Sequence, residues 1–145
     1  MDYGRISQNN MKISVKPDKE KAKSLLFMAR LTLERLKETD KPKYPSHTLT
    51  DYYDIIHNLM ESLSLIKGVK IKSEGAHQEL IEYTCRTYQV SEESRLFLQN
   101  LRNLRNRIVY EGFFIKPNYL EANENHILLL IDKLESLINQ QLKNE

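Results

Sequence analysis

The chain has 145 residues, a length typical of one domain, and its formal net charge is only +2. So small a charge does not by itself indicate nucleic-acid binding, and any electrostatic argument must rest on local clusters. The single cysteine, Cys85, excludes an internal disulfide and suits a reducing compartment, and no apolar run approaches the ~20 residues that cross a bilayer. Because the N-terminus also lacks the apolar centre of a secretory signal, we expect a cytoplasmic protein.

The fold class follows from the spacing of apolar residues. Four glycines and four prolines separate long segments with helical periodicity, and strand-like alternation is scarce. We therefore expect an all-α protein, an up-and-down bundle of about five helices. Residues 1–16 are expected to form a poorly ordered N-terminal arm, and residues 17–145 the helical domain.

The first two helices are expected on either side of a proline-rich break. Pro17 is suited to the first position of a helix that continues to about residue 38. The break is "TDKPKYPSH", after which residues 46–50 offer several hydroxyl groups as N-caps for a second helix. Gly68 is the expected end of that helix.

Three further helices are expected in the second half of the chain. A shorter helix is predicted within residues 72–89, and Ser91 is the predicted N-cap of a fourth helix that ends near Gly112. The connector "EGFFIKPN" is expected to bury Phe113 and Phe114, and Asn118 to cap the last helix, which extends to about residue 142.

The fourth predicted helix contains a cluster of arginines within "LRNLRNRIVYEGF", residues 101–113. Arg102, Arg105 and Arg107 occupy six positions, and the sequence between Glu93 and Glu111 contains no acid. Helical geometry puts these arginines beside the apolar seam of the helix, at the edge of the packed face. Guanidinium groups in such a position suit phosphate, although a solvated face paired with nearby acids explains the spacing equally well.

The same segment carries a resemblance to a family. A helical bundle with "LRNLRNRIVYEG" on its penultimate long helix resembles the HEPN superfamily of prokaryotic nucleotide- and RNA-binding proteins, over about residues 17–143. The family motif is an arginine, a polar residue and, after four to six intervening positions, a histidine. "RNRIVY" matches this frame from Arg105 and Asn106, but Tyr110 stands where the histidine is expected.

The resemblance implies roles for these residues. Arg105 corresponds to the arginine that contacts the scissile phosphate, Asn106 to the polar residue that positions the site, and Tyr110 to the family's histidine. The clustering of arginines, rather than the resemblance, makes Arg102 and Arg107 further candidates for phosphate binding. The resemblance also implies a homodimer whose two arginine helices line one cleft. Many relatives are toxins with metal-independent endoribonuclease activity, encoded beside a minimal nucleotidyltransferase antitoxin.

The tyrosine changes the expected chemistry. Cleavage of RNA without a metal needs a base for the 2′-hydroxyl and an acid for the leaving oxygen, both with a pKa near the working pH. Tyrosine titrates near ~10 and histidine near ~6.5, so Tyr110 is a poor base at neutral pH. We therefore expect RNA binding with weak or absent cleavage.

Other polar residues have structural explanations at least as good. His77 lies on the apolar side of the third helix, where a structural histidine is more common than an accessory acid or base that reaches the arginines; His57 has the same two readings. Asp51 and Asp54 are typical of a helix's first turn. No spacing of histidines suits a metal and no phosphate loop is present, so neither metal nor cofactor is expected.

Two alternatives to RNA binding remain open. In the first, the bundle is a non-enzymatic dimeric interaction or scaffold module whose arginines bind a partner's acids. In the second, it is an enzyme of another type that uses His77.

Overall fold

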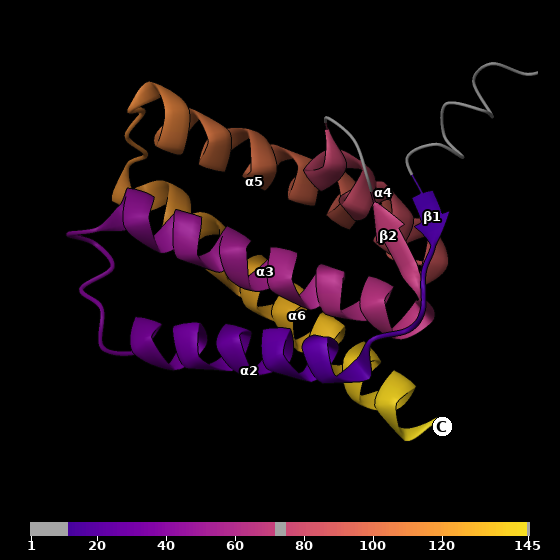
Figure 1. The fold of residues 1–145 in the computed structure, drawn as a ribbon. Helices are drawn as coiled ribbons and strands as arrows, with labels where there is room; N and C mark the ends of the chain where they lie inside the picture. The colour runs from indigo at the N-terminus through magenta and orange to yellow at the C-terminus, as the bar shows by residue number, and fades with distance from the viewer. Residues whose placement is uncertain (1–11, 72–74, 145) are drawn as a thin grey trace, which may run out of the picture.

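The computed structural model describes residues 12–71 and 75–144, in which five helices surround one core and a short two-stranded sheet closes one end (Figure 1). The helices are α2 (Lys19–Leu36), α3 (Pro45–Lys67), α4 (Ala76–Thr87), α5 (Glu92–Glu111) and α6 (Pro117–Lys143). The strands are β1 (Lys12–Ser14) and β2 (Val69–Ile71). The prediction of an all-α helical bundle is confirmed.

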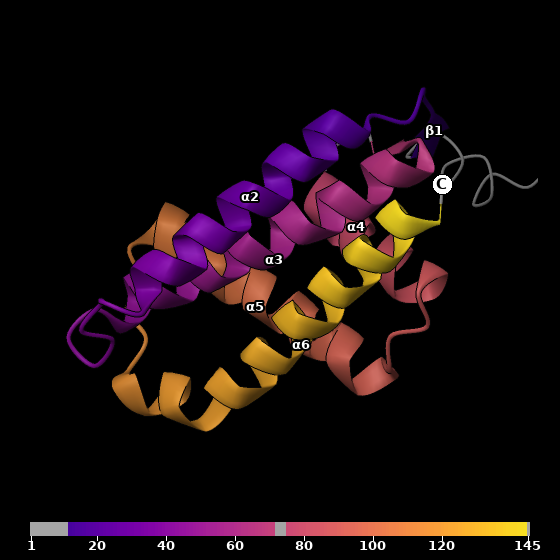
Figure 2. The same ribbon diagram turned by 90° about the horizontal axis from the view of Figure 1, so that it is seen from below.

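Helix α3 is the centre of the bundle. It packs against α2, α4, α5 and α6, and it supplies more buried side chains than any other described helix. Helices α2 and α3 lie side by side in opposite directions, and α6 packs against α3 (Figure 2). Buried polar bonds join the helices: Ser62 Oγ donates to the carbonyl of Ala22 over 2.9 Å, and the Tyr52 hydroxyl to Glu124 over 2.7 Å.

The helix boundaries differ slightly from the predicted ones. Asp18 is the N-cap of α2 and accepts from the backbone N–H of Lys21 over 3.0 Å, so Pro17 precedes the helix. Helix α3 begins at Pro45, before the hydroxyl residues that were expected to cap it. Gly68 ends α3 with a positive φ of 74°, as predicted.

The segment before α2 is more structured than the sequence indicates. Residues Lys12–Ser14 pair antiparallel with Val69–Ile71, and the backbone N–H of Val15 donates to the carbonyl of Gly68 over 2.8 Å. Residues 12–15 of the arm that was expected to be poorly ordered are therefore held by backbone bonds, and residues 1–11 lie outside the described residues. The backbone bonds to β2 explain the difference, because they depend on the partner strand rather than on local sequence.

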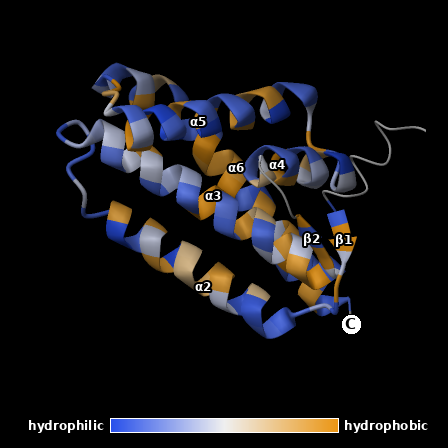
Figure 3. Ribbon diagram, turned by 45° about the horizontal axis from the view of Figure 1, so that its top comes forward, coloured by the Kyte–Doolittle hydropathy of each residue, from blue (hydrophilic) through white to orange (hydrophobic). Residues whose placement is uncertain are grey.

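Helix α5, which carries the arginines, is attached to the bundle by few fully buried side chains. Ser91 caps it through a bond from the Ser94 N–H of 3.2 Å, as predicted, and Gly112 ends it with φ of 68°. Only Leu98 and Leu101 are buried. Most of the helix is hydrophilic, and a narrow apolar stripe meets the core (Figure 3).

The connector to α6 buries a different residue from the one expected. Phe113 is partly buried against the core, but Phe114 is 82% exposed, so the prediction for Phe114 is wrong. Ile115 is buried instead, and its N–H donates to Ser46 Oγ over 3.0 Å, which fixes the direction of the chain here. Helix α6 begins at Pro117, and Asn118 therefore lies within its first turn rather than at its cap.

Helix α6 returns the chain to the end of the bundle at which β1 lies (Figures 1 and 2). None of the described helices has an apolar stretch long enough to cross a bilayer.

Candidate functional site

Two of the three clustered arginines lie along the side of α5 that faces α3. The Arg105 side chain is only 19% exposed, and its Nε lies 3.6 Å from Oδ1 of Asp54 on α3. That distance is too long for a hydrogen bond, and among the described residues this buried Nε has no hydrogen-bond partner. Arg102 Nε donates to the neutral amide oxygen of Gln99 over 2.9 Å. Neither guanidinium is tightly bound by a carboxylate.

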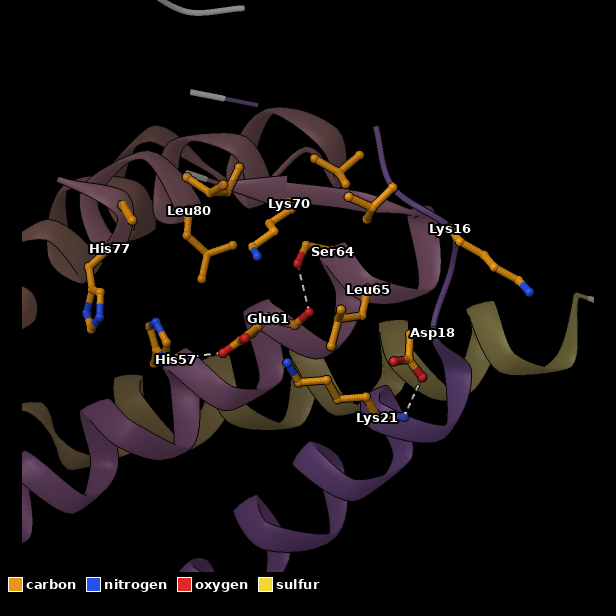
Figure 4. A pocket seen from close by; sticks show the side chains of 14 residues that line it. Lys16, Asp18, Lys21, His57, Glu61, Ser64, Leu65, Lys70, His77 and Leu80 are labelled. Carbon is orange, nitrogen blue, oxygen red and sulfur yellow. Dashed lines mark hydrogen bonds and ion pairs between the residues drawn. The ribbon is translucent and has the colours of Figure 1, made fainter. Parts of the chain in front are cut away.

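A pair of stacked histidines lies beside these arginines. The rings of His57 on α3 and His77 on α4 stack with centroids 4.1 Å apart (Figure 4). The Tyr53 hydroxyl lies 3.4 Å from His77 Nδ1, and the Tyr53 ring stacks on the His77 ring at 6.1 Å. Three aromatic rings from two helices therefore form one cluster, which lies close enough to Arg102 and Arg105 of α5 for their charges to act on it.

Burial and the arginines keep both imidazoles neutral. Burial lowers the pKa of His57 to about 4, with further lowering by His77 and Arg105. Burial also lowers the pKa of His77, and the charges of Arg105 and Arg102 add to that effect. Both rings are therefore uncharged at neutral pH, and each has one nitrogen that donates and one that accepts a hydrogen bond.

Tyr53 acts as a hydrogen-bond donor to this pair of imidazoles. Burial raises its pKa to about 12, against the effect of Arg102 and Arg105, so its hydroxyl stays protonated and able to donate to His77. Tyr53 is fully buried and cannot reach a ligand in solvent. It can only orient the imidazole.

Asp51 and Asp54 lie beyond the first turn of α3, contrary to expectation, and they have different partners. Asp51 Oδ2 forms a 2.9 Å ion pair with Arg35 of α2, whereas Asp54 faces Arg105. Burial raises the pKa of the Asp54 carboxyl, although Arg105 opposes that shift. Sequence spacing suggested only a first-turn role for Asp54, because nothing local reveals which helix packs against it.

The other residues of the predicted site do not join this cluster. The Arg107 guanidinium lies 3.8 Å from the centre of the Phe113 ring, a cation–π contact. Tyr110 is 75% exposed and follows Arg105 by five residues, which is ~140° around a helix. Asn106 is partly buried on the same helix. Arg105 and Tyr110 therefore do not converge within one copy of the chain.

His77, by contrast, does lie near the arginines. The sequence left its role open, and the structure brings it together with His57. The signal for His57 was its spacing of four residues from Tyr53, which sets both rings on one side of α3.

Neither the remaining histidines nor the cysteine adds a second site. His126 stacks on Phe97 at 4.1 Å and lies 3.2 Å from the Ser94 hydroxyl, and His47 contacts the Tyr44 ring. Burial raises the pKa of the Cys85 thiol to about 11, so it is unreactive as a thiolate. In the part of the chain that the structure describes, no group of three or more His, Cys, Asp or Glu side chains could hold a metal.

Comparisons with protein-family models, with curated proteins and with solved structures give no match to this chain. The resemblance to the HEPN superfamily therefore rests on the arginine motif and the order of the helices alone.

Proposed function

We propose that this protein binds RNA, and that Arg102 and Arg105 contact its phosphates at the edge of α5. The observation that carries the proposal is the state of Arg105. Its buried Nε has a donor without a hydrogen-bond acceptor, and the nearest carboxylate, Asp54, is 3.6 Å away. Because Nε itself is buried, a phosphate would contact the part of the Arg105 side chain that remains exposed, and the long contact with Asp54 leaves the guanidinium charge only partly engaged.

The histidines beside Arg102 and Arg105 could add hydrogen bonds to the positive charge of the two arginines. With Nδ1 accepting from Tyr53, a neutral His77 carries its proton on Nε2, which can donate a hydrogen bond to the oxygen of a ribose 2′-hydroxyl, the group that distinguishes RNA from DNA. In that tautomer His77 has no free nitrogen to act as a general base, and no acid for the leaving oxygen is evident among the described residues, since Tyr53 is buried and Tyr110 lies elsewhere. Binding with little cleavage is the function that we propose.

Two copies of the chain would complete such a site, as the HEPN resemblance implies. Helix α5 leaves Val109 45% and Tyr110 75% exposed, beside the 82% exposed Phe114. Pairing of these apolar side chains across a twofold axis would bring two arginine edges together and double the local positive charge. A role as the toxin partner of a nucleotidyltransferase belongs to the same proposal.

Binding of single-stranded RNA at several salt concentrations tests the proposal. Each of Arg102→Ala and Arg105→Ala should weaken binding and reduce the slope of log K against log salt by ~0.7, because one phosphate contact is lost. Arg86→Ala is the matched control, since Arg86 is held by Glu79 at 2.9 Å on α4. An affinity that is unaffected by either α5 variant would refute the proposal, as would cleavage at a rate typical of ribonucleases that Arg105→Ala abolishes.

The second candidate function is a dimeric scaffold that binds no RNA. The exposed apolar end of α5 favours it, because a protein–protein contact alone would cover those side chains. A Tyr110→Glu variant that becomes monomeric, in a protein that shows no salt-sensitive RNA binding, would select this alternative.

A further inference from the structure

The stacked histidines also form one wall of a pocket that uses no residue of α5. The pocket has a volume of about 470 Å³, within the ~300–1,000 Å³ typical of small-molecule sites. It lies between α3, the start of α4, strand β2 and the segment that joins β1 to α2. Its lining combines an apolar wall with charged groups of both signs, and this combination restricts the ligands that it suits.

Two lysines of the pocket have no acidic partner. Figure 4 shows the side chains of Lys21 and Lys70 turned toward the interior, whereas Lys16 at the rim points away. In the part of the chain that the structure describes, neither of the two inward ammonium groups forms a salt bridge. Both are therefore available to a carboxylate of a ligand.

The pocket also offers one carboxylate without a cationic partner. Of the two described acids that line it, Asp18 is engaged as the N-cap of α2 and accepts from the backbone N–H of Lys21 over 3.0 Å. Glu61 lies 3.9 Å from Nδ1 of His57, which is too long for a hydrogen bond, and the neutral His57 ring supplies no charge. The Glu61 carboxylate is therefore available to an ammonium group of a ligand.

These opposite charges argue against a simple ion as the ligand. A compact anion on Lys21 and Lys70 would be repelled by Glu61, and a simple cation on Glu61 would be repelled by the two lysines. A ligand with one charge of each sign is attracted by all three groups, because each of its ends meets the opposite charge. A free α-amino acid carries such a pair of charges on a single carbon atom.

The apolar wall indicates the side chain that such an amino acid would have. Leu65, Ile71 and Leu80 supply aliphatic surface, and the stacked histidine rings line the same space. Contact with this wall removes apolar surface from water, which favours a large aliphatic or aromatic side chain over a small or charged one.

We propose that this pocket binds a free α-amino acid with a large apolar side chain. The carboxylate of the ligand lies on Lys21 and Lys70, its ammonium group lies on Glu61, and its side chain lies against the apolar wall. This proposal does not depend on RNA binding, because none of these residues belongs to α5. Amino-acid binding without RNA binding would refute the proposed function alone, and RNA binding without amino-acid binding would refute the pocket alone.

Calorimetric titration of the full chain with leucine, phenylalanine, tryptophan and glycine tests the proposal. At least one of the three large amino acids should bind about tenfold more tightly than glycine, which has no side chain to place on the wall. The amide of that amino acid lacks the carboxylate and its N-acetyl derivative lacks the ammonium group, so each should bind about fivefold more weakly. The proposal is overturned if none of the three binds, or if both derivatives bind as tightly as the amino acid itself.

Variants of the full chain assign each charge of the ligand to its partner. Glu61→Gln should abolish the preference for the amino acid over its N-acetyl derivative and retain the preference over its amide. Lys21→Gln and Lys70→Gln should each reduce the preference over the amide and retain the preference over the N-acetyl derivative. Lys16→Gln is the matched control and should change neither, with thermal unfolding verifying that each variant is folded. Preferences that remain unchanged in Glu61→Gln and Lys70→Gln, or that are lost equally in Lys16→Gln, would contradict the assignment.

Discussion

The rings of His57 and His77 stack 4.1 Å apart although they belong to different helices. Because both are partly buried and face Arg105, a proton on either ring is unfavourable in the folded protein. Protonation of either ring at low pH should therefore weaken the contact between α3 and α4.

The first prediction concerns stability in acid. The pKa of His57 is about 4 in the folded protein and ~6.5 when unfolded, so the unfolded state binds more protons between these values. The contribution of the neutral His57 ring to the free energy of unfolding is fully present above pH ~6.5, and it decreases by about 3 kcal/mol as the pH drops toward 4. Urea unfolding between pH 7 and 4.5 should show a flatter pH dependence for His57→Gln than for the wild type. His126→Gln is the control, and identical curves for His57→Gln and wild type would contradict the prediction.

The second prediction compares two glycines with similar backbone conformations. Gly68 and Gly112 have φ of 74° and 68°, but a Cβ at Gly68 would lie 2.6 Å from the carbonyl oxygen of Val15, whereas a Cβ at Gly112 would meet nothing within 4 Å. Gly112→Ala should cost only the ~1–2 kcal/mol of a left-handed alanine, and Gly68→Ala clearly more. Chemical denaturation measures both, and equal losses would mean that the chain at Val15 moves away without cost.

The third prediction concerns the acid beside Arg105. Asp54→Asn removes the only carboxylate that forms an ion pair with Arg105 among the described residues, so phosphate meets less competition there. RNA affinity should rise about two- to fivefold, corresponding to ~1 kcal/mol or less. Asp51→Asn, one helical turn away and paired with Arg35, is the control and should not increase affinity. Weaker RNA binding by Asp54→Asn would show that Asp54 positions Arg105 instead of competing with the phosphate.

The fourth prediction separates Arg107 from its neighbours. Because its guanidinium stacks on Phe113, Arg107→Gln should reduce stability by ~0.5–1 kcal/mol and change RNA affinity less than Arg102→Ala or Arg105→Ala does. Thermal unfolding and the RNA titration measure the two effects on the same samples. A loss of affinity equal to that of Arg105→Ala would show that Arg107 also contacts the RNA.

Local sequence signals were sufficient for most of the fold. Apolar spacing predicted five helices, and Ser91, Gly68 and Gly112 mark three helix ends as expected, because caps act through backbone groups a few residues away. The errors involve distant partners. Strand β1 depends on β2, more than fifty residues later, and Phe114 is exposed because Ile115 takes the buried position.

The candidate site was harder to predict for the same reason. The arginine motif is contiguous and therefore visible, but Asp54, His57 and His77 join it only through the packing of α3 and α4 against α5. Periodicity gives the inward side of each helix and not the rotation and offset that bring particular residues into register. The placement of Asp54 opposite Arg105 depends on that offset.

The sparse burial of α5 has a consequence for the protein's fluctuations. A helix of 20 residues with only Leu98 and Leu101 fully buried can separate from the bundle at a smaller cost than α3 or α6 can. Its amide hydrogens should accordingly exchange with deuterium before those of α3. A bound polyanion that bridges α5 and α4 would slow that exchange, so the helix that carries the arginines would also report their occupancy.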